Sequence, residues 1–402
     1  MKKFLAVVLA AALALSLVAC GGAPASSGAS SAGSEGGSTP ASTQSYDYKI
    51  GVVTPSGDHG FTGESVAQAN LMAEEMMAKY PGMDITVRDG IDAAAQIEAI
   101  ENLLASGDMD MIILWPMEGE ALRSAAQSIV DAGVKLVVYD RLIEGFTADT
   151  FVGDIMGDNV GIGKAMGEYL NEFYADDDDV QYLRFVGDSS TVTSQRSEGM
   201  DGVLGDNFNQ VAETLVTNWS TEEAQGQMED WLNAHSVEEI EALDLIVTHD
   251  DEIVDGIMNA LDAYSGEATI NVKLITSVGG REETMQKFES TQLGVKFWTS
   301  FFSPSFIRDA FELGIGDLIG EPYTAEQDEN GTYLIPSFSI TNNAETHQMV
   351  VAGAGDIQID VLVSKLKSRF SVEAVLDTPR VPYREKIRKT VSKQGKFKKQ
   401  TG

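Results

Sequence analysis

The sequence has few of the residues that build disulfide or metal-held frameworks. It contains one cysteine and four histidines in 402 residues. A single cysteine excludes an intramolecular disulfide, so the fold must depend on its hydrophobic core. No C-x-x-C, H-E-x-x-H, Walker-type glycine loop or G-x-S-x-G motif is present, and these are the usual signatures of metal sites, phosphate sites and serine hydrolases. We therefore expect no cofactor, no metal site and no enzymatic activity.

Basic side chains are also scarce. The chain carries 28 Lys and Arg against 62 Asp and Glu, a net charge of −34, which argues against a nucleic-acid partner because phosphates would be repelled. Residues 361–402 nevertheless hold 12 of the basic residues and only three of the acidic ones. So abrupt a change indicates two segments of different origin. The acidic run 176–179 lacks the alternating spacing of a calcium loop and is interpreted as solvated.

An apolar run long enough to cross a membrane is lacking at the start of the chain. Residues 4–19 are apolar and follow two lysines; about 16 residues is short for a spanning helix but suits a secretory signal. Residues 17–20, Leu-Val-Ala-Cys, resemble the lipobox of bacterial lipoproteins. The resemblance implies that Cys20 is lipidated and anchors the protein in the lipid bilayer, on the extracytoplasmic face. Residues 1–20 are thus interpreted as a lipoprotein signal peptide with its lipobox, and the alternative is a plain signal peptide with an accidental cysteine.

The next segment, residues 21–45, is rich in Gly, Ser and Ala. Such a composition buries no apolar surface, so it predicts a flexible tether.

From residue 46 to about 343, short runs of β-branched residues alternate with helix-length amphipathic stretches. Strands are predicted near 48–53, 110–114, 135–140, 180–187, 243–249 and 272–279. Continuous apolar strands linked by helices indicate parallel sheets covered on both faces, and nearly 300 residues favour two α/β lobes.

Polar and aromatic residues follow five of the predicted strands, in the stretches 54–64, 115–122, 139–142, 187–199 and 248–256. Ligands of open parallel sheets bind at the carboxyl ends of the strands. These five stretches therefore predict one ligand site.

The order and spacing of these stretches resemble the ribose/galactose type of periplasmic sugar-binding proteins, the solute receptors of ABC importers. The resemblance implies an α/β fold of two Rossmann-like lobes joined by a three-strand hinge, a type I periplasmic binding protein, which acts as a monomer. The implied domains are 46–152 with 303–336 for the first lobe and 153–302 with 337–343 for the second. The implied crossings lie near 152–154, 298–303 and 335–339, and Asp154, Asp158 and Asn159 are interpreted as hinge and helix-capping residues.

The resemblance also implies the residues of the site. A sugar needs carboxylates and Arg forks for its hydroxyls and aromatic rings for its apolar faces. The expected ligand-binding residues are Asp58, His59, Phe61, Trp115, Glu118, Asp140, Arg141, Arg196, Asp250, Asp251 and Phe302. Trp115 and the aromatic residues near Phe302 stand where polar or small residues are usual, so the cleft should be more aromatic than that of the type member. The expected partners are a monosaccharide or related polyol and the membrane permease of an ABC importer.

Several of these residues have alternative interpretations. Asp58 and His59 also suit a polar turn, and Glu118 suits a helix N-terminus. Arg141 and Arg196 also suit structural ion pairs.

The basic segment resembles a second family. Residues 344–402 contain "GAGDIQIDVLVSKLKSRF", "TPRVPYREKIRK" and "GKFKKQTG", which resemble a fragment of bacterial elongation factor G. The resemblance implies a partial α+β appendage without a GTPase domain, joined to the body either by accident or as a genuine fusion. We expect residues from about 380 on to pack poorly against the body.

Three other functions are alternatives to that of an importer receptor. The same fold serves receptors for chemotaxis or two-component signalling that bind a sugar or sugar-like autoinducer. A sugar-responsive repressor would need an N-terminal helix-turn-helix where this chain has its signal. A translation factor is supported only by the basic segment.

Overall fold

The computed structural model describes residues 45–57, 60–325, 327–328, 330–335, 337–343, 348–353, 359, 362–364, 366–367 and 373–378. Cys20, residues 21–44 of the tether, Asp58 and His59 lie outside these residues, as does the segment from residue 379 on. The lipid anchor and the poor packing of the end of the chain therefore stay predictions. Within the described part of the chain, no helix has both the length and the apolar character needed to cross a membrane.

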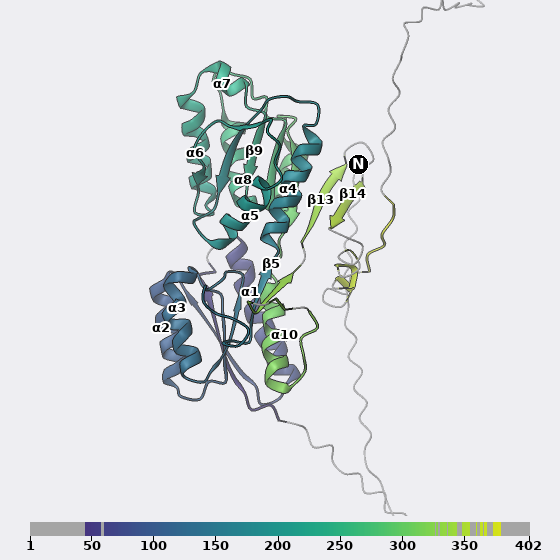
Figure 1. Ribbon diagram of the computed structural model, residues 1–402. Coiled ribbons are helices and arrows are strands. Elements are labelled where there is room, and N and C mark those ends of the chain that lie inside the picture. Colours follow the sequence, from purple (N-terminus) through teal and green to yellow (C-terminus); the bar gives the residue numbers. More distant parts are fainter. Residues whose placement is uncertain are drawn as a thin grey trace, which may run out of the picture. The chain divides into compact units, whose positions relative to one another are not determined.

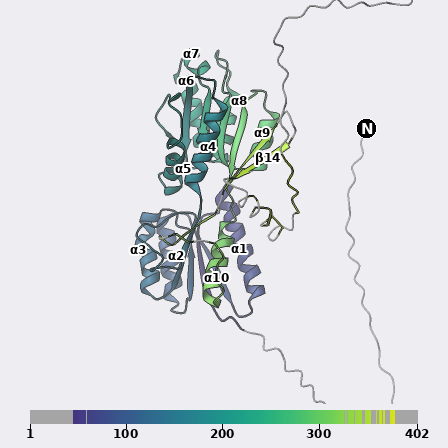
Figure 2. The same cartoon turned by 45° about the vertical axis from the view of Figure 1, so that its right-hand side comes forward.

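The first lobe is built on a parallel sheet of six strands in the order β12-β5-β4-β3-β1-β2. The strands are β1 (Lys49–Pro55), β2 (Asp84–Gly90), β3 (Met111–Leu114), β4 (Lys135–Tyr139), β5 (Gly153–Gly157) and β12 (Thr332–Ile335). Helices α1 (Gly60–Lys79) and α10 (Phe306–Ile319) lie side by side on one face, while α2 (Ala93–Ala105) and α3 (Gly119–Asp131) cover the other (Figures 1 and 2). Both faces are covered, which explains why all four residues of β3 are buried and apolar.

The second lobe has a sheet in the order β14-β13-β11-β10-β9-β6-β7, with β8 also paired to β6. Its strands are β6 (Val180–Val186), β7 (Phe208–Gln210), β8 (Leu215–Val216), β9 (Leu245–Thr248), β10 (Leu274–Gly279), β11 (Lys296–Phe301), β13 (Phe338–Asn343) and β14 (Gln348–Gly353). Its helices are α4 (Asn159–Phe173), α5 (Thr191–Asp201), α6 (Thr221–Ala234), α7 (Val237–Glu241), α8 (Asp251–Ala263) and α9 (Glu282–Ser290). Helices α4 and α5 pack on one face, and α6 and α8 on the other. The predicted fold class, two α/β lobes with parallel sheets, is confirmed.

The chain passes between the lobes at three places. β5 pairs with β4 and β12, so the first sheet extends to Gly157, past the boundary predicted at residue 152. The first crossing falls at Asp158, whose side chain accepts a hydrogen bond from the backbone N–H of Gly161 at 2.8 Å and caps α4. The other two crossings lie between β11 and α10 and between β12 and β13.

The second sheet continues into the segment that resembles elongation factor G. β13 runs antiparallel to β11, and β14 runs antiparallel to β13, with Phe338 opposite Gly353 and Asn343 opposite Gln348. The sheet therefore continues past the boundary predicted at residue 343. Without β14, β13 would be an edge strand with unpaired backbone N–H and C=O groups, and β14 supplies hydrogen-bond partners for them.

Glycines allow α4 and α5 to approach closely. A Cβ atom at Gly199 of α5 would lie 2.1 Å from the carbonyl oxygen of Val160, and one at Gly163 of α4 would lie 2.0 Å from the carbonyl oxygen of Arg196. Both contacts are with backbone, which cannot rotate away. The distance between these helices is thus set by the absence of two side chains.

We expect Gly199→Ala to lower the free energy of unfolding by about 1–3 kcal/mol, because the added methyl group forces the helices apart. Gly226→Ala is the matched control: Gly226 also lies inside a helix, α6, and has no atom within 4 Å of its would-be Cβ. There alanine should stabilise by about 0.5–1 kcal/mol through its helix propensity. Urea unfolding of both variants measures the difference, and equal effects would show that α4 and α5 are not tightly packed.

Candidate ligand-binding site

A cavity of about 70 Å³ lies between the lobes, at the carboxyl ends of their strands. Its lining residues come from both halves of the chain: Phe61, Thr62, Trp115, Asp140, Arg141, Val192, Arg196, Trp219, Asp250, Glu252 and Phe302. A cavity needs at least about 10–15 Å³ by this measure to hold one water, so the space is large enough for more than one water-sized group.

Aromatic rings form the apolar wall of the cavity. The ring of Phe61 lies 5.8 Å from that of Trp115 in an edge-to-face arrangement and 5.4 Å from that of Phe302. Phe61 opens α1 in the first lobe, whereas Phe302 follows β11 of the second. The rings therefore make an apolar contact across the hinge and offer faces suited to C–H groups of a ligand.

Arg196 supplies a buried positive charge from the second lobe. Its side chain is on α5 and is only 3% exposed. Its Nε donates to Oδ1 of Asn159 at 2.9 Å and its Nη1 to the carbonyl oxygen of His249 at 2.6 Å. The guanidinium also lies 4.6 Å from the centre of the Phe302 ring. Burial lowers the pKa of Arg196 to about 10, so the side chain is still charged at neutral pH.

Arg141 supplies a second positive charge, from the first lobe. It follows β4, donates through Nη1 to the carbonyl oxygen of Met117, and its Nη2 lies 3.2 Å from a carboxylate oxygen of Asp188. Asp188 follows β6 in the second lobe, so this ion pair joins the lobes. Burial of Asp188 acts against its ionisation, but the charge of Arg141 and a hydrogen bond from Ser190 hold the pKa of Asp188 below its ordinary value.

Two carboxyl groups, the buried Asp140 and the partly buried Asp250, lie at the cavity beside these arginines. Asp140 is 4% exposed, has a φ of 69°, and its Oδ1 lacks a hydrogen-bond partner among the described residues. Burial raises the pKa of Asp140 despite the nearby charges of Arg141 and Arg196. Burial and the neighbouring Asp251 raise the pKa of Asp250 to about 8. The protonated carboxyl group of Asp250 can both donate and accept hydrogen bonds at neutral pH, which suits a hydroxyl-bearing ligand.

Seven of the predicted site residues line this cavity: Phe61, Trp115, Asp140, Arg141, Arg196, Asp250 and Phe302. Glu118 does not, because it is exposed at the N-terminus of α3. Asp251 does not line it either: its carboxylate accepts hydrogen bonds at 2.6 Å from Ser277 Oγ and from the backbone N–H of Arg281. Asp251 thus ties α8 to the end of β10.

Four residues that line the cavity were not predicted from the sequence: Thr62, Val192, Trp219 and Glu252. Trp219 was missed because the two-residue strand β8 that precedes it has no recognisable pattern. Thr62 and Glu252 directly follow the predicted residues Phe61 and Asp251, so proximity in the sequence could have indicated them. The role of Asp188 in joining the lobes depends on the contact with Arg141 and has no signal in the sequence.

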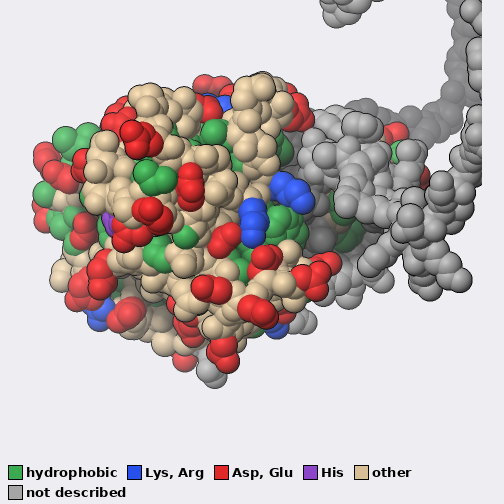
Figure 3. All heavy atoms as spheres, turned by 90° about the horizontal axis from the view of Figure 1, so that it is seen from above, with side chains coloured by type: hydrophobic (Ala, Val, Ile, Leu, Met, Phe, Trp, Pro, Cys, Tyr) green, Lys and Arg blue, Asp and Glu red, His purple; other side chains and the backbone are tan. Residues whose placement is uncertain are grey.

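The outer surface repels anions. Figure 3 shows carboxylates spread over the described part of one face, with few basic side chains among them. The positive charges of Arg141 and Arg196 are by contrast largely buried at the cavity, with Arg141 14% exposed. A neutral or weakly charged ligand is therefore better suited to this site than a strongly anionic one.

We expect Asp250→Asn to change how stability depends on pH. Between about pH 4 and 8 an unfolded aspartate has lost its proton, whereas Asp250 in the folded protein retains it. Stability of the natural protein should therefore fall by up to about 1.4 kcal/mol per pH unit across this window through this group. Asparagine removes the effect and keeps the helix cap, which accepts from the N–H of Glu252.

Urea unfolding between pH 4 and 8 measures this difference. The natural protein should lose stability relative to Asp250→Asn as the pH rises, while a change at the exposed Asp206, Asp206→Asn, should give a profile parallel to that of the natural protein. Parallel profiles for Asp250→Asn would contradict the raised pKa.

Comparisons with known proteins agree with this architecture. A galactofuranose-binding protein is 17% identical, with a TM-score of 0.61 over 73% of this chain and 94% of that protein. An ABC transporter solute-binding protein from Bacillus halodurans C-125, solved with bound myo-inositol, is 18% identical, with a TM-score of 0.60 over 74% and 96%. The fructose-binding periplasmic domain of a hybrid two-component system is 16% identical, with a TM-score of 0.59 over 81% and 98%. At these identities the likeness establishes the fold.

Two family models match the sequence itself. The model of elongation factor G, domain III, matches residues 336–378, and thus the last part of the described chain, including β13 and β14. The periplasmic binding protein domain matches residues 50–296, which is more than half of the chain and includes all the cavity residues except Phe302. The two-lobed fold, the site at the strand ends and this match agree, and the chain belongs to the periplasmic binding protein family.

Proposed function

We propose that the protein is an extracytoplasmic solute receptor that binds a simple sugar or polyol in the cavity between its lobes and delivers it to an ABC-type importer. The observation that carries this proposal is the composition of the cavity. Aromatic rings, two arginines and two carboxyl groups of raised pKa come from both lobes and meet around one small space. A polyhydroxylated ring presents the matching chemistry, hydroxyls at its edge and C–H groups on its faces.

The relatives of similar fold support a neutral, hydroxyl-rich ligand. Galactofuranose, myo-inositol and fructose are named for three of them. Among the lining residues, Asp140 and Arg196 are the best placed to bind hydroxyls, since both are buried and Asp140 has an oxygen without a partner among the described residues. Glu118 is left out of the proposed binding set.

Ligand binding would favour the closed arrangement of the lobes. The ion pair of Arg141 with Asp188 and the contact of Phe61 with Phe302 already join the two lobes. A ligand that contacts both lobes adds interactions that an open form cannot make, so it shifts the population toward the closed form that a permease would recognise. The receptor would perform no catalysis.

A calorimetric screen of galactose, arabinose, fructose, allose and myo-inositol tests the proposal, and we expect saturable binding of at least one. Arg141→Ala should weaken that binding at least tenfold, because a charge-assisted hydrogen bond is worth about 1.5–3 kcal/mol. Arg123→Ala is the matched control, since Arg123 lies on the surface of α3 beside Glu120 and should bind as the natural protein does. No binding by any of the five, or equal affinity in Arg141→Ala, would refute the proposed site.

The lipid anchor is a separate part of the proposal. Cys20→Ser should abolish incorporation of labelled palmitate and release the protein from the membrane fraction, because the thiol is the atom that would carry the lipid. Ser26→Ala, a change of similar size in the predicted tether, should leave labelling and membrane attachment intact. Palmitate labelling that persists in Cys20→Ser would exclude this anchor.

A signalling receptor is the second candidate, because a relative of similar fold is the fructose-binding domain of a hybrid two-component system. Deletion of the gene separates the two. An importer receptor is required for uptake of the labelled ligand. A signalling receptor is required for a ligand-dependent transcriptional or chemotactic response while uptake continues.

A further inference from the structure

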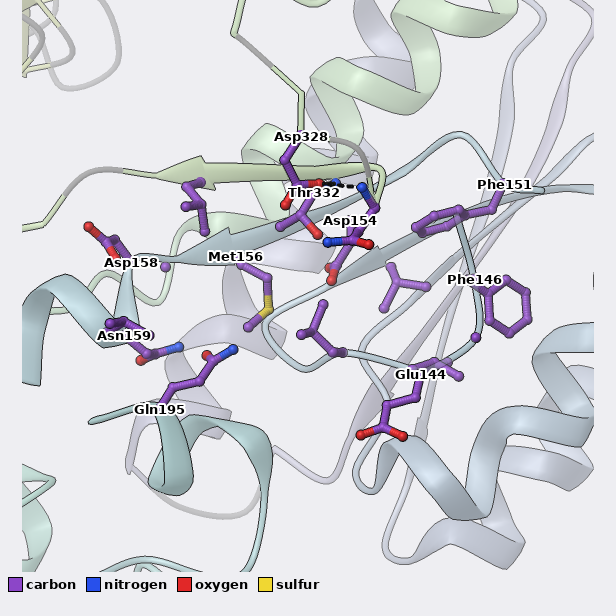
Figure 4. A pocket seen from close by; sticks show the side chains of 18 residues that line it. Glu144, Phe146, Phe151, Asp154, Met156, Asp158, Asn159, Gln195, Asp328 and Thr332 are labelled. Carbon is purple, nitrogen blue, oxygen red and sulfur yellow. Dashed lines mark hydrogen bonds between the residues drawn. The ribbon is translucent and has the colours of Figure 1, made fainter. Parts of the chain in front are cut away.

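A second pocket, of about 430 Å³, lies beside the hinge and shares no lining residue with the cavity described above. We call it the hinge pocket. Its lining combines carboxylates such as Asp154 and Asp328 with the amides of Asn159 and Gln195 and the aromatic rings of Phe146 and Phe151. Figure 4 shows Asp154 and Asp328 from the first lobe on one side of it and Asn159 and Gln195 on the other.

The sheet topology explains why this space is open. Asp154 on β5 stands beside Val138 of β4 and Thr332 of β12, so these three side chains share one face of the sheet. On this face α3 packs on β4, while α10 covers the opposite face of β4 and β5. The loop that carries Phe146 and Phe151 roofs the uncovered part.

Asp154 is the unexplained group in the hinge pocket. It is 1% exposed, and neither of its carboxylate oxygens has a hydrogen-bond partner among the described residues. The other carboxylates of the pocket are engaged: Asp158 caps α4, Asp328 accepts from the backbone N–H groups of Asn330 and Thr332, and Glu144 lies 3.6 Å from Arg123. A buried carboxyl group without a partner is costly, so its retention points to an occupant.

The remaining lining restricts the chemistry of that occupant. The pocket contains four carboxylates and no Lys, Arg or His, which disfavours an anion. Among the described residues no cluster of three His, Cys, Asp or Glu is arranged to hold a metal ion. Phe146 and Phe151, with rings 5.7 Å apart, and Leu334 supply apolar surface. An ammonium group pairs with a carboxylate and tolerates aromatic faces, and its apolar stem can cover hydrocarbon.

We propose that the hinge pocket binds a small organic cation, an amine with a short apolar chain, whose ammonium group pairs with the carboxylate of Asp154. The amide nitrogen of Asn159, which has no partner among the described residues, lies at the same pocket. The net charge of −34 favours the approach of such a ligand. This proposal does not depend on which solute occupies the cavity between the lobes.

The hinge pocket also contacts the first cavity through one side chain. Asn159 is 1% exposed, and its Oδ1 accepts from Nε of Arg196 at 2.9 Å while its Nδ2 lines the hinge pocket. An occupant of the hinge pocket thus touches the residue that orients Arg196. The second site is separate in its lining but adjoins the first through Asn159.

The surroundings of Asp154 favour its neutral form. Burial, together with the negative charges of Asp140 and Asp328, raises the pKa of Asp154 well above its ordinary value. A bound ammonium group favours the ionised carboxylate. Binding at neutral pH should therefore release protons to the buffer, a signature that a neutral ligand does not produce.

Isothermal titration calorimetry of the full chain with n-butylammonium chloride tests the proposal, with 1-butanol as the neutral probe of matched chain. We expect saturable binding of the amine and none of the alcohol. Titrations at pH 7 in two buffers of different ionisation enthalpy should reveal proton release. Asp154→Asn, which keeps the shape of the side chain, should weaken amine binding at least tenfold and abolish proton release.

Asp206→Asn is the matched control, because it makes the same change at an exposed aspartate that does not line the hinge pocket, and it should change the affinity less than twofold. Three results would overturn the proposal: no saturable binding of n-butylammonium up to 10 mM, equal binding of 1-butanol, or unchanged affinity in Asp154→Asn. If Asp154→Asn fails to fold, the comparison of the two probes and the proton release in the natural protein still decide.

Discussion

The buried guanidinium of Arg196 constrains the architecture of the site. Removing such a charge from water is expensive unless neighbouring groups replace the lost hydration. Asn159 at the start of α4 and the carbonyl oxygen of His249 provide hydrogen bonds, and the ring of Phe302 provides a face. These groups can surround Arg196 only because α5 approaches α4 at the distance that Gly199 permits. The position of the charge thus depends on helix packing.

The polar side chains of the proposed site lower the stability of the folded protein. The surroundings of Asp140, which is buried, and of Asp250, which is partly buried, raise the pKa of both side chains, and Asp140 has an oxygen without a partner among the described residues. A core optimised for stability would hold apolar side chains at such positions. Local departures of this kind are typical of functional sites. Here they lie at the carboxyl ends of the strands, which is where ligands of open parallel sheets bind.

The segment that resembles elongation factor G extends the sheet of the second lobe, but it takes no part in the proposed function of the two lobes. β14 joins β13 through backbone groups, which any extended segment can offer to an edge strand. Backbone pairing depends little on side-chain identity, so its presence is weak evidence of a common origin with the lobes. The family match over residues 336–378 and the basic composition beyond it both set this segment apart from the body.

The sequence by itself determined the two-lobed α/β class, because buried parallel strands such as β3 need continuous runs of apolar residues, which can be recognised in the amino-acid sequence. It also indicated the stretches that follow the strands, which contain Phe61, Arg141 and Arg196. Tertiary structure alone decided which of these side chains share a cavity. Glu118 and Asp251 stand at strand ends too, yet one faces solvent and the other binds Ser277. The physical reason is that side-chain direction and the contacts between lobes depend on residues distant in sequence, which no local pattern records.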